Sequence, residues 1–172
     1  AGPVTIDNQL KTTTGGINLQ STGGSVSIAP TAAIVAPDAA GGTLTIDAGT
    51  FVSVGIPVVV GNDVTVTTGA SWVPTEDITT TNGSIAIVST NGDLDVSGIT
   101  LSAVGGTPPN YGSAFLSAFA GTLTVDLTTI LLNSDFGNLT LIGGSLVGFG
   151  GAAYSLGGTL TVQTGSSVVP AV

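Results

Sequence analysis

The chain of 172 residues has no cysteine, histidine, arginine or methionine, and Lys11 is its only cationic side chain. Without Cys, His or Arg, the sequence excludes thiol and imidazole chemistry, the usual zinc sites and bidentate phosphate binding. Ten carboxylates against one lysine give a formal net charge of -9, so the chain cannot neutralise a nucleic-acid backbone. We therefore expect a non-enzymatic protein with no cofactor, no metal and no nucleic-acid partner.

Long hydrophobic runs are also missing. The run from Ile56 to Val60 is interrupted by Pro57 and is followed by Gly61. It is far shorter than the ~18 residues that a membrane-spanning helix needs. Hydrophobic residues still make up 42% of the chain, which is enough for a core, and they are evenly spread. We expect a single β-rich domain over 1–172 without a membrane span.

Helix-forming residues are scarce, with one Glu, one Lys and little 3.6-residue periodicity. The stretch 114–120 is the exception, because Phe115, Ala118 and Phe119 have helical spacing. This stretch allows one or two helical turns, or equally a loop that plugs one end of the core.

Most of the chain alternates apolar and polar residues, the pattern of half-buried β-strands. The pattern recurs in short phrases, and three of them share the form Gly-Thr-Leu-Thr-Ile/Val, beginning at Gly42, Gly121 and Gly158. The first apolar residues of the phrases recur about every 19 residues, provided that the interval from Ile85 to Leu123 spans two turns, with Leu101 or Val104 near the missing position.

This spacing predicts an all-β fold, a parallel β-solenoid with turns of about 20 residues. The alternative is a β-sandwich of pilin or immunoglobulin-like type, in which Asn82-Gly83 and Asn91-Gly92 would be hairpin turns. The repeated phrase and its period favour the solenoid.

From about Gly24 to Gly165 the chain resembles the right-handed parallel β-helices of filamentous-haemagglutinin-like exported adhesins, and the three Gly-Thr-Leu-Thr phrases carry the resemblance. The resemblance implies an extracellular or cell-surface location and says little about a ligand. A first residue that is Ala rather than Met fits a processed, exported chain.

The phrases also predict which side chains share a row. Two apolar ladders would line the interior, and a row of threonines between them would face outward. A flat outward row of this kind is a candidate ice-binding or adhesive surface, although Thr is also common at exposed strand positions for packing reasons. The predicted ladders are Leu44, Val64, Ile85, Leu123 and Leu160, and Ile46, Val66, Ile87, Val125 and Val162; the predicted outward row is Thr45, Thr65, Ala86, Thr124 and Thr161.

The carboxylates are too dispersed for a calcium loop. Asp93 and Asp95 point the same way on a strand and, with Asp47 and Asp126, are the best candidates for oxygen ligands or paired acids. Solvated acidic positions that maintain solubility are the simpler interpretation.

Two N-glycosylation sequons, at Asn82 and Asn138, are candidate modification sites and would make the protein a glycoprotein.

The ends of the chain have few charges to protect exposed sheet edges from pairing with other chains. The segments 1–23 and 166–172 are therefore expected to cap the solenoid or to pair with another subunit. We expect an extracellular structural subunit that forms a homopolymeric filament or matrix by strand pairing. The alternative is a monomeric adhesin or ice-binding module that contacts glycans or surfaces through its threonine face.

Overall fold

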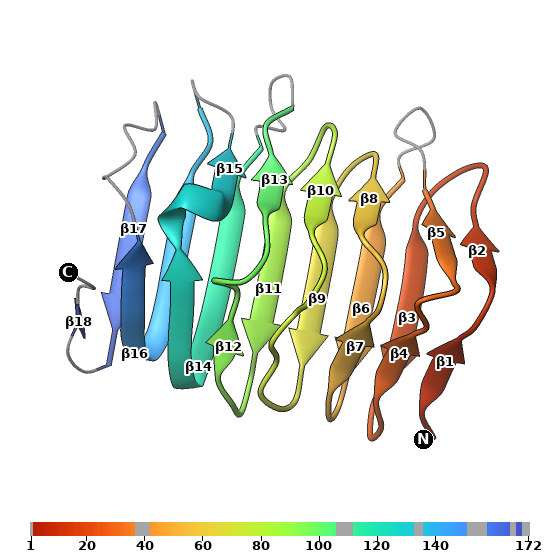
Figure 1. Cartoon of the computed structure of the whole chain (residues 1–172), viewed down its shortest axis with the longest axis horizontal. Helices are drawn as coiled ribbons and strands as arrows, with labels where there is room; N and C mark the ends of the chain where they lie inside the picture. Colours follow the sequence, from red (N-terminus) through yellow and green to blue (C-terminus); the bar gives the residue numbers. More distant parts are fainter. Residues whose placement is uncertain are drawn as a thin grey trace.

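The computed structural model shows an all-β chain whose strands stack as a parallel β-solenoid of about 6 turns (Figure 1). The structure describes residues 2–36, 42–105, 112–132, 136–150, 158–165 and 168–169. Each of its strand pairings is parallel, whereas hairpins of a sandwich would be antiparallel. The solenoid prediction is thus confirmed, and the sandwich alternative is wrong.

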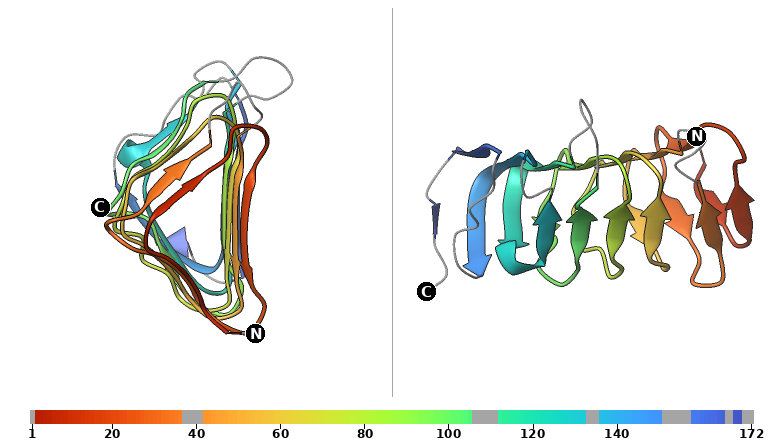
Figure 2. Two further views of the ribbon diagram at one scale, coloured as in Figure 1. Left: turned by 90° about the vertical axis from the view of Figure 1, so that its right-hand side faces the viewer. Right: turned by 90° about the horizontal axis from the view of Figure 1, so that it is seen from above.

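Each turn has three faces, which form a triangle when the coil is viewed end-on (Figure 2). The first face carries β1 (Val4–Ile6), β4 (Val26–Ile28), β7 (Val52–Val54), β12 (Leu94–Asp95) and β18 (Val168–Val169). The second carries β2 (Gln9–Lys11), β5 (Ala33–Val35), β8 (Val58–Val60), β10 (Ile78–Thr80), β13 (Leu101–Ala103) and β15 (Ile130–Leu132). The third carries β3 (Ile17–Ser21), β6 (Leu44–Ala48), β9 (Val64–Thr68), β11 (Ile85–Ser89) and β17 (Leu160–Thr164).

Two long strands, β14 (Ala114–Asp126) and β16 (Leu139–Gly150), belong to two faces. Their first halves pair with third-face strands, and their second halves continue around a corner onto the first face. The single described 3-10 turn, η2 (Leu127–Thr129), follows β14.

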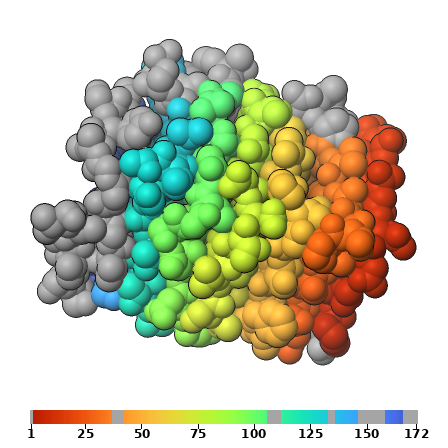
Figure 3. Space-filling model, viewed as in Figure 1, coloured from red at the N-terminus to blue at the C-terminus, as the bar shows by residue number. Residues whose placement is uncertain are grey.

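The coil is right-handed, because the chain runs clockwise as it recedes from the N-terminal end in the end-on view of Figure 2. The turns appear as successive bands along the axis in the space-filling view of Figure 3. None of the helical segments in the described part of the chain is long and apolar enough to span a membrane.

Turn length varies more than the sequence period predicts. Leu44 pairs with Val64 and Val64 with Ile85, so these turns hold 20 and 21 residues. The next third-face partner of Ile85 is Ala114, 29 residues further on. The position expected near Leu101 is therefore filled by Ala114, and Leu101 lies on the second face.

This long turn corrects the predicted apolar ladders. Leu44, Val64 and Ile85 do share a row, but Leu123 pairs with Leu94 on the first face. The Gly121 phrase falls after the corner of β14, so Val125 also leaves its predicted ladder. The observed rows are Ile17, Leu44, Val64, Ile85, Ala114, Leu139 and Leu160, and Leu19, Ile46, Val66, Ile87, Leu116, Leu141 and Val162.

The stretch 114–120 is strand rather than helix or plug. Its residues form the first half of β14, and Ala114–Ala118 pair in register with β11 and β16. The pairing with β16 shifts register between Ala118 and Thr122, at the corner. Strand pairing on both sides outweighs the local helical spacing of Phe115 and Phe119.

Alternate side chains point into the triangle and form one continuous apolar core. Two small polar side chains that are buried near corners bond to backbone carbonyls: Ser89 Oγ donates to the carbonyls of Ala70 and Gly92, and Thr80 Oγ1 donates to that of Gly83. These bonds satisfy hydroxyl groups that burial would otherwise leave without partners. The buried Ser117 Oγ of β14 differs, because it has no hydrogen-bond partner in the described part of the chain.

Candidate functional site

The C-terminal end of the stack exposes side chains that are buried in every turn before it. Leu160 and Val162 of β17 hold inward positions, yet they are 50% and 38% exposed. The corresponding Leu44 and Ile46 of β6 are each 1% exposed. β17 pairs with β16, and no other strand of the described residues pairs with it. An apolar surface therefore lies open at this end.

The N-terminal end is formed by β1, β2 and β3, which make the first turn of the solenoid. Each pairs with one described strand, in the second turn: β4, β5 and β6 respectively. Inward residues here include Ile17 and Leu19, and Val4, Ile6 and Leu10 are partly buried against the core. The described residues 2–23 of the segment expected to cap or pair thus form a full turn of the solenoid, and one edge of each of its strands has no partner among the described strands.

Charge is concentrated between the two ends. Nine of the ten carboxylates lie between positions 38 and 135, and the segment 136–172 carries no charged side chain. The first 37 residues carry only Asp7 and Lys11, which have opposite charges. Because like charges oppose association, the two end turns are the parts of the molecule where a second copy meets least repulsion.

A column of side chains runs along the corner before the third face and links each turn to the next. Asp63 Oδ1 accepts a hydrogen bond from the backbone N–H of Ser84 (2.8 Å), and Ser84 Oγ accepts one from Ser113 (3.3 Å). Ser113 Oγ accepts one from the N–H of Asn138 (3.0 Å), and Asn138 Oδ1 accepts one from Thr159 (2.7 Å). From Asp63 to Asn138, each turn thus offers a side-chain acceptor to the turn that follows it.

The predicted threonine row is broken. Thr45 and Thr65 are in register on the outer side of the third face, followed by Ala86 and Phe115. Thr124 lies on the first face, paired with Asp95. The actual outward row is Asn18, Thr45, Thr65, Ala86, Phe115, Thr140 and Thr161.

The candidate acidic residues serve as local hydrogen-bond acceptors. Asp93 Oδ1 accepts from the N–H of Thr122 (2.7 Å), and Asp95 Oδ1 accepts from the N–H and the hydroxyl of Ser97. Asp47 Oδ2 accepts from Gln20 Nε2 (3.0 Å). Within the described ranges, no three acidic side chains come together in a group that could hold a metal ion.

Asp126 caps the 3-10 turn η2. Its Oδ1 accepts from the hydroxyl of Thr128 (2.7 Å) and from the N–H of the same residue (2.8 Å). These two bonds favour the charged form, so the pKa of Asp126 lies below its ordinary value.

The two sequon asparagines differ in their surroundings. Asn138 is exposed, and its Oδ1 rather than its Nδ2 holds the hydrogen bond to the next turn. Asn82 is half-buried, and its Nδ2, the atom that a glycan would modify, donates to Asn62 Oδ1 at 3.5 Å. Asn138 is thus the more accessible of the two predicted sites.

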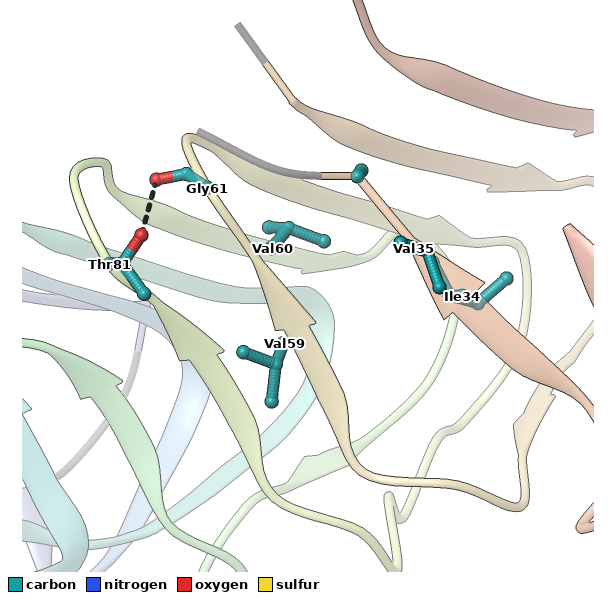
Figure 4. Close-up of a pocket in the computed structure, with 7 residues that line it drawn as sticks. Ile34, Val35, Val59, Val60, Gly61 and Thr81 are labelled. Atoms are coloured by element: carbon teal, nitrogen blue, oxygen red, sulfur yellow. Dashed lines mark hydrogen bonds between the residues drawn. The ribbon is translucent and has the colours of Figure 1, made fainter. Parts of the chain in front are cut away.

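A shallow apolar groove opens where the second face divides into two sheets. β5 and β8 meet through the single bridge between Ala36 and Val60, and the groove beside it has a volume of about 300 Å³. Figure 4 shows Val35 and Val59 along the groove and the Thr81 hydroxyl that donates to the carbonyl of Gly61 (3.1 Å). The groove carries no charged side chain among its lining residues.

Comparison of the chain with family models, with curated proteins and with solved structures found no match. The functional assignment therefore rests on the geometry of the two ends. The sequence shows that the ends have few charges, but it does not identify Leu160 and Val162 as the exposed pair, because the Gly158 phrase is nearly identical to the buried Gly42 phrase.

Proposed function

We propose that the protein is a non-enzymatic, extracellular structural subunit that joins other copies end to end through strand pairing and so builds a surface filament or matrix. The observation that carries the proposal is the exposure of Leu160 and Val162 at inward positions of β17. The composition and the resemblance of the repeats to exported β-helices support the extracellular setting.

The strand edges at the two ends of the solenoid can pair with each other. One presents β17 and the other presents the first-turn strands, and all of them run parallel to their neighbours. Different surfaces of one molecule that fit each other make a heterologous contact, which repeats without closing and so gives a fibre. Strand addition would extend the backbone ladder and cover the apolar side chains at the same time.

Sedimentation velocity over a concentration series tests this function. The wild-type chain should sediment as larger species as concentration rises, and Leu160→Asp should remain a monomer because it places a charge in the contact. Val73→Asp is the matched control: Val73 is 65% exposed on the side of the coil, so this variant should assemble like the wild type. Equal assembly of all three chains would contradict end-to-end joining.

A second candidate function is a monomeric adhesin or ice-binding module. Its support is the in-register pair Thr45 and Thr65, with Thr67 beside them on the same outward side of the sheet. Thermal hysteresis of the monomer, abolished by Thr65→Lys and retained by Leu160→Asp, would favour this function over assembly.

A further inference from the structure

Resting on the proposed function, we propose a defined register for the contact between copies: β3 of a second copy pairs in parallel with β17, so that Ile17 follows Leu160 and Leu19 follows Val162. In the same step β1 of the second copy takes the edge of β16 that β18 holds in the single chain.

The inward rows support the register on the third face. The row that ends at Leu160 begins at Ile17, and every residue in it is apolar; the same holds for the row from Leu19 to Val162. β3 and β17 are both five-residue strands. Adding β3 after β17 repeats the pairing already present in each turn and covers both exposed side chains.

The hydrogen bonds of the corner column support the same register. Asn138 accepts a hydrogen bond from the N–H of Thr159, the residue just before β17. Thr159 occupies the next position of this column, and Gly16 is the residue just before β3. In the proposed register the Thr159 hydroxyl lies beside the N–H of Gly16 of the second copy, in the arrangement that links Ser113 to Asn138.

The number of strand levels explains why β18 must move. In the described part of the chain, the third face has seven levels, from β3 to β17. The first face also has seven through the second half of β16, counting the bridge at Trp72, and β18 adds an eighth. β18 therefore occupies the edge of β16 that β1 of the second copy needs when β3 sits on β17.

The electrostatics favour this pair of surfaces. Residues 136–172 carry no charged side chain, and the first turn contributes only Asp7 and Lys11, which have opposite charges. Contact in this register thus places the many carboxylates of each copy away from those of its neighbour, which limits repulsion.

The absence of cysteine in the wild type permits a direct test by disulfide trapping. Gln163 and Gln20 are exposed positions that become neighbours in the proposed register. Adjacent strands are about 4.8 Å apart, within the roughly 4.4–6.8 Å range of Cα separations that disulfides span. After mild oxidation, the double variant Q163C/Q20C should give a ladder of covalent oligomers on a non-reducing gel.

The matched control is Q163C/N18C. It moves one cysteine two residues along β3 and increases the Cα separation to roughly 8 Å, beyond disulfide reach. It should give no ladder, and neither should Q163C alone. Filaments by electron microscopy without a Q163C/Q20C ladder, or with an equal ladder in the control, would overturn the register and leave the proposed function standing. Absence of any assembly would overturn both.

The role of β18 has its own variant. Val168→Pro removes a backbone N–H and disfavours β18 in its ladder with β16. If β18 competes with β1 of a second copy, freeing the edge raises the fraction of molecules ready to dock. Assembly should then begin at a concentration no higher than about one third of the concentration that the wild type needs. Unchanged or weaker assembly would refute the exchange of β18 for β1.

Discussion

Two copies of one five-residue phrase differ sharply in how far the molecule buries their inward side chains. Gly42-Thr43-Leu44-Thr45-Ile46 and Gly158-Thr159-Leu160-Thr161-Val162 differ only in their last residue, and both place alternate side chains inward. Leu44 is 1% exposed, whereas Leu160 is 50% exposed. Since the local sequence is the same, burial here is a property of the neighbouring turns.

The third copy, at Gly121, also shows that the neighbouring turns determine burial. Leu123 is fully buried although it lies on the first face, between Leu94 and Leu146 in the strand ladder. In a solenoid each repeat is stabilised mainly at its interfaces with the turns before and after it. A turn with one such interface is therefore expected to be the least stable part of the stack, and under the proposed function it is the turn to which a second copy joins.

The largest expected effect comes from placing a charge in each copy of the phrase. Leu123→Asp should lower the free energy of unfolding by about 4 kcal/mol or more, because an unpaired carboxylate would be buried in the core. Leu160→Asp should lower it by less than about 1 kcal/mol, because that side chain already meets solvent. Urea unfolding followed by circular dichroism measures both, and wild-type stability in Leu123→Asp would refute the assignment of the core.

A methyl group added at equivalent corners gives the next largest difference. At Gly69 a Cβ would lie 1.9 Å from the carbonyl oxygen of Gly49 in the previous turn. At Gly165, the matching residue of the last described turn, the nearest atom is the Gly144 oxygen at 3.5 Å. Gly69→Ala should destabilise by about 1–3 kcal/mol and Gly165→Ala by under about 0.5 kcal/mol. Similar thermal shifts for the two variants would contradict the close stacking of interior corners.

The link between the last two turns can be weakened without changing charge. Asn138→Ala removes the acceptor for the Thr159 N–H and should cost about 1 kcal/mol, with faster hydrogen exchange at the Thr159 amide. Asn82→Ala removes only a 3.5 Å contact and should leave that amide unchanged. Equal exchange at Thr159 in both variants would show that the corner column does not hold β17.

The smallest effect concerns acid stability at η2. The pKa of Asp126 is lowered from its ordinary value of 3.8, first by the Thr128 hydroxyl and then by the Thr128 N–H. The contribution of the charged Asp126 carboxylate to the free energy of unfolding is therefore complete above pH 3.8, and it is lost as the pH falls through the lower pKa of the folded state. Thr128→Val should raise the pKa of Asp126 in a carboxyl NMR titration, and an unchanged titration would refute the capping bond.

The sequence was sufficient to predict the fold class and several in-register residues. The period and the alternating phrases predicted a parallel coil and placed Leu44, Val64 and Ile85 in one row, as the structure confirms. Alternation reports which side chains face inward, and this is a local property of the strand.

The failures came from non-local features. The rung Ala114–Ala118 lacks polar alternation, and the connection from β11 to β14 is longer than the earlier ones, so a constant period placed Leu123 on the wrong face. The phrase specifies a strand beside a glycine corner, but it does not specify on which face that corner falls. Nor does it reveal which copy ends the stack, since Leu44 and Leu160 have the same neighbours in sequence.

The most direct test of end-to-end joining is electron microscopy of the purified, untreated protein over a range of concentrations. End-to-end joining in the proposed register should give unbranched fibres whose axial repeat is seven strand spacings, or roughly 34 Å, and Leu160→Asp should abolish them. Single dispersed particles at every concentration, or fibres that Leu160→Asp leaves intact, would contradict it.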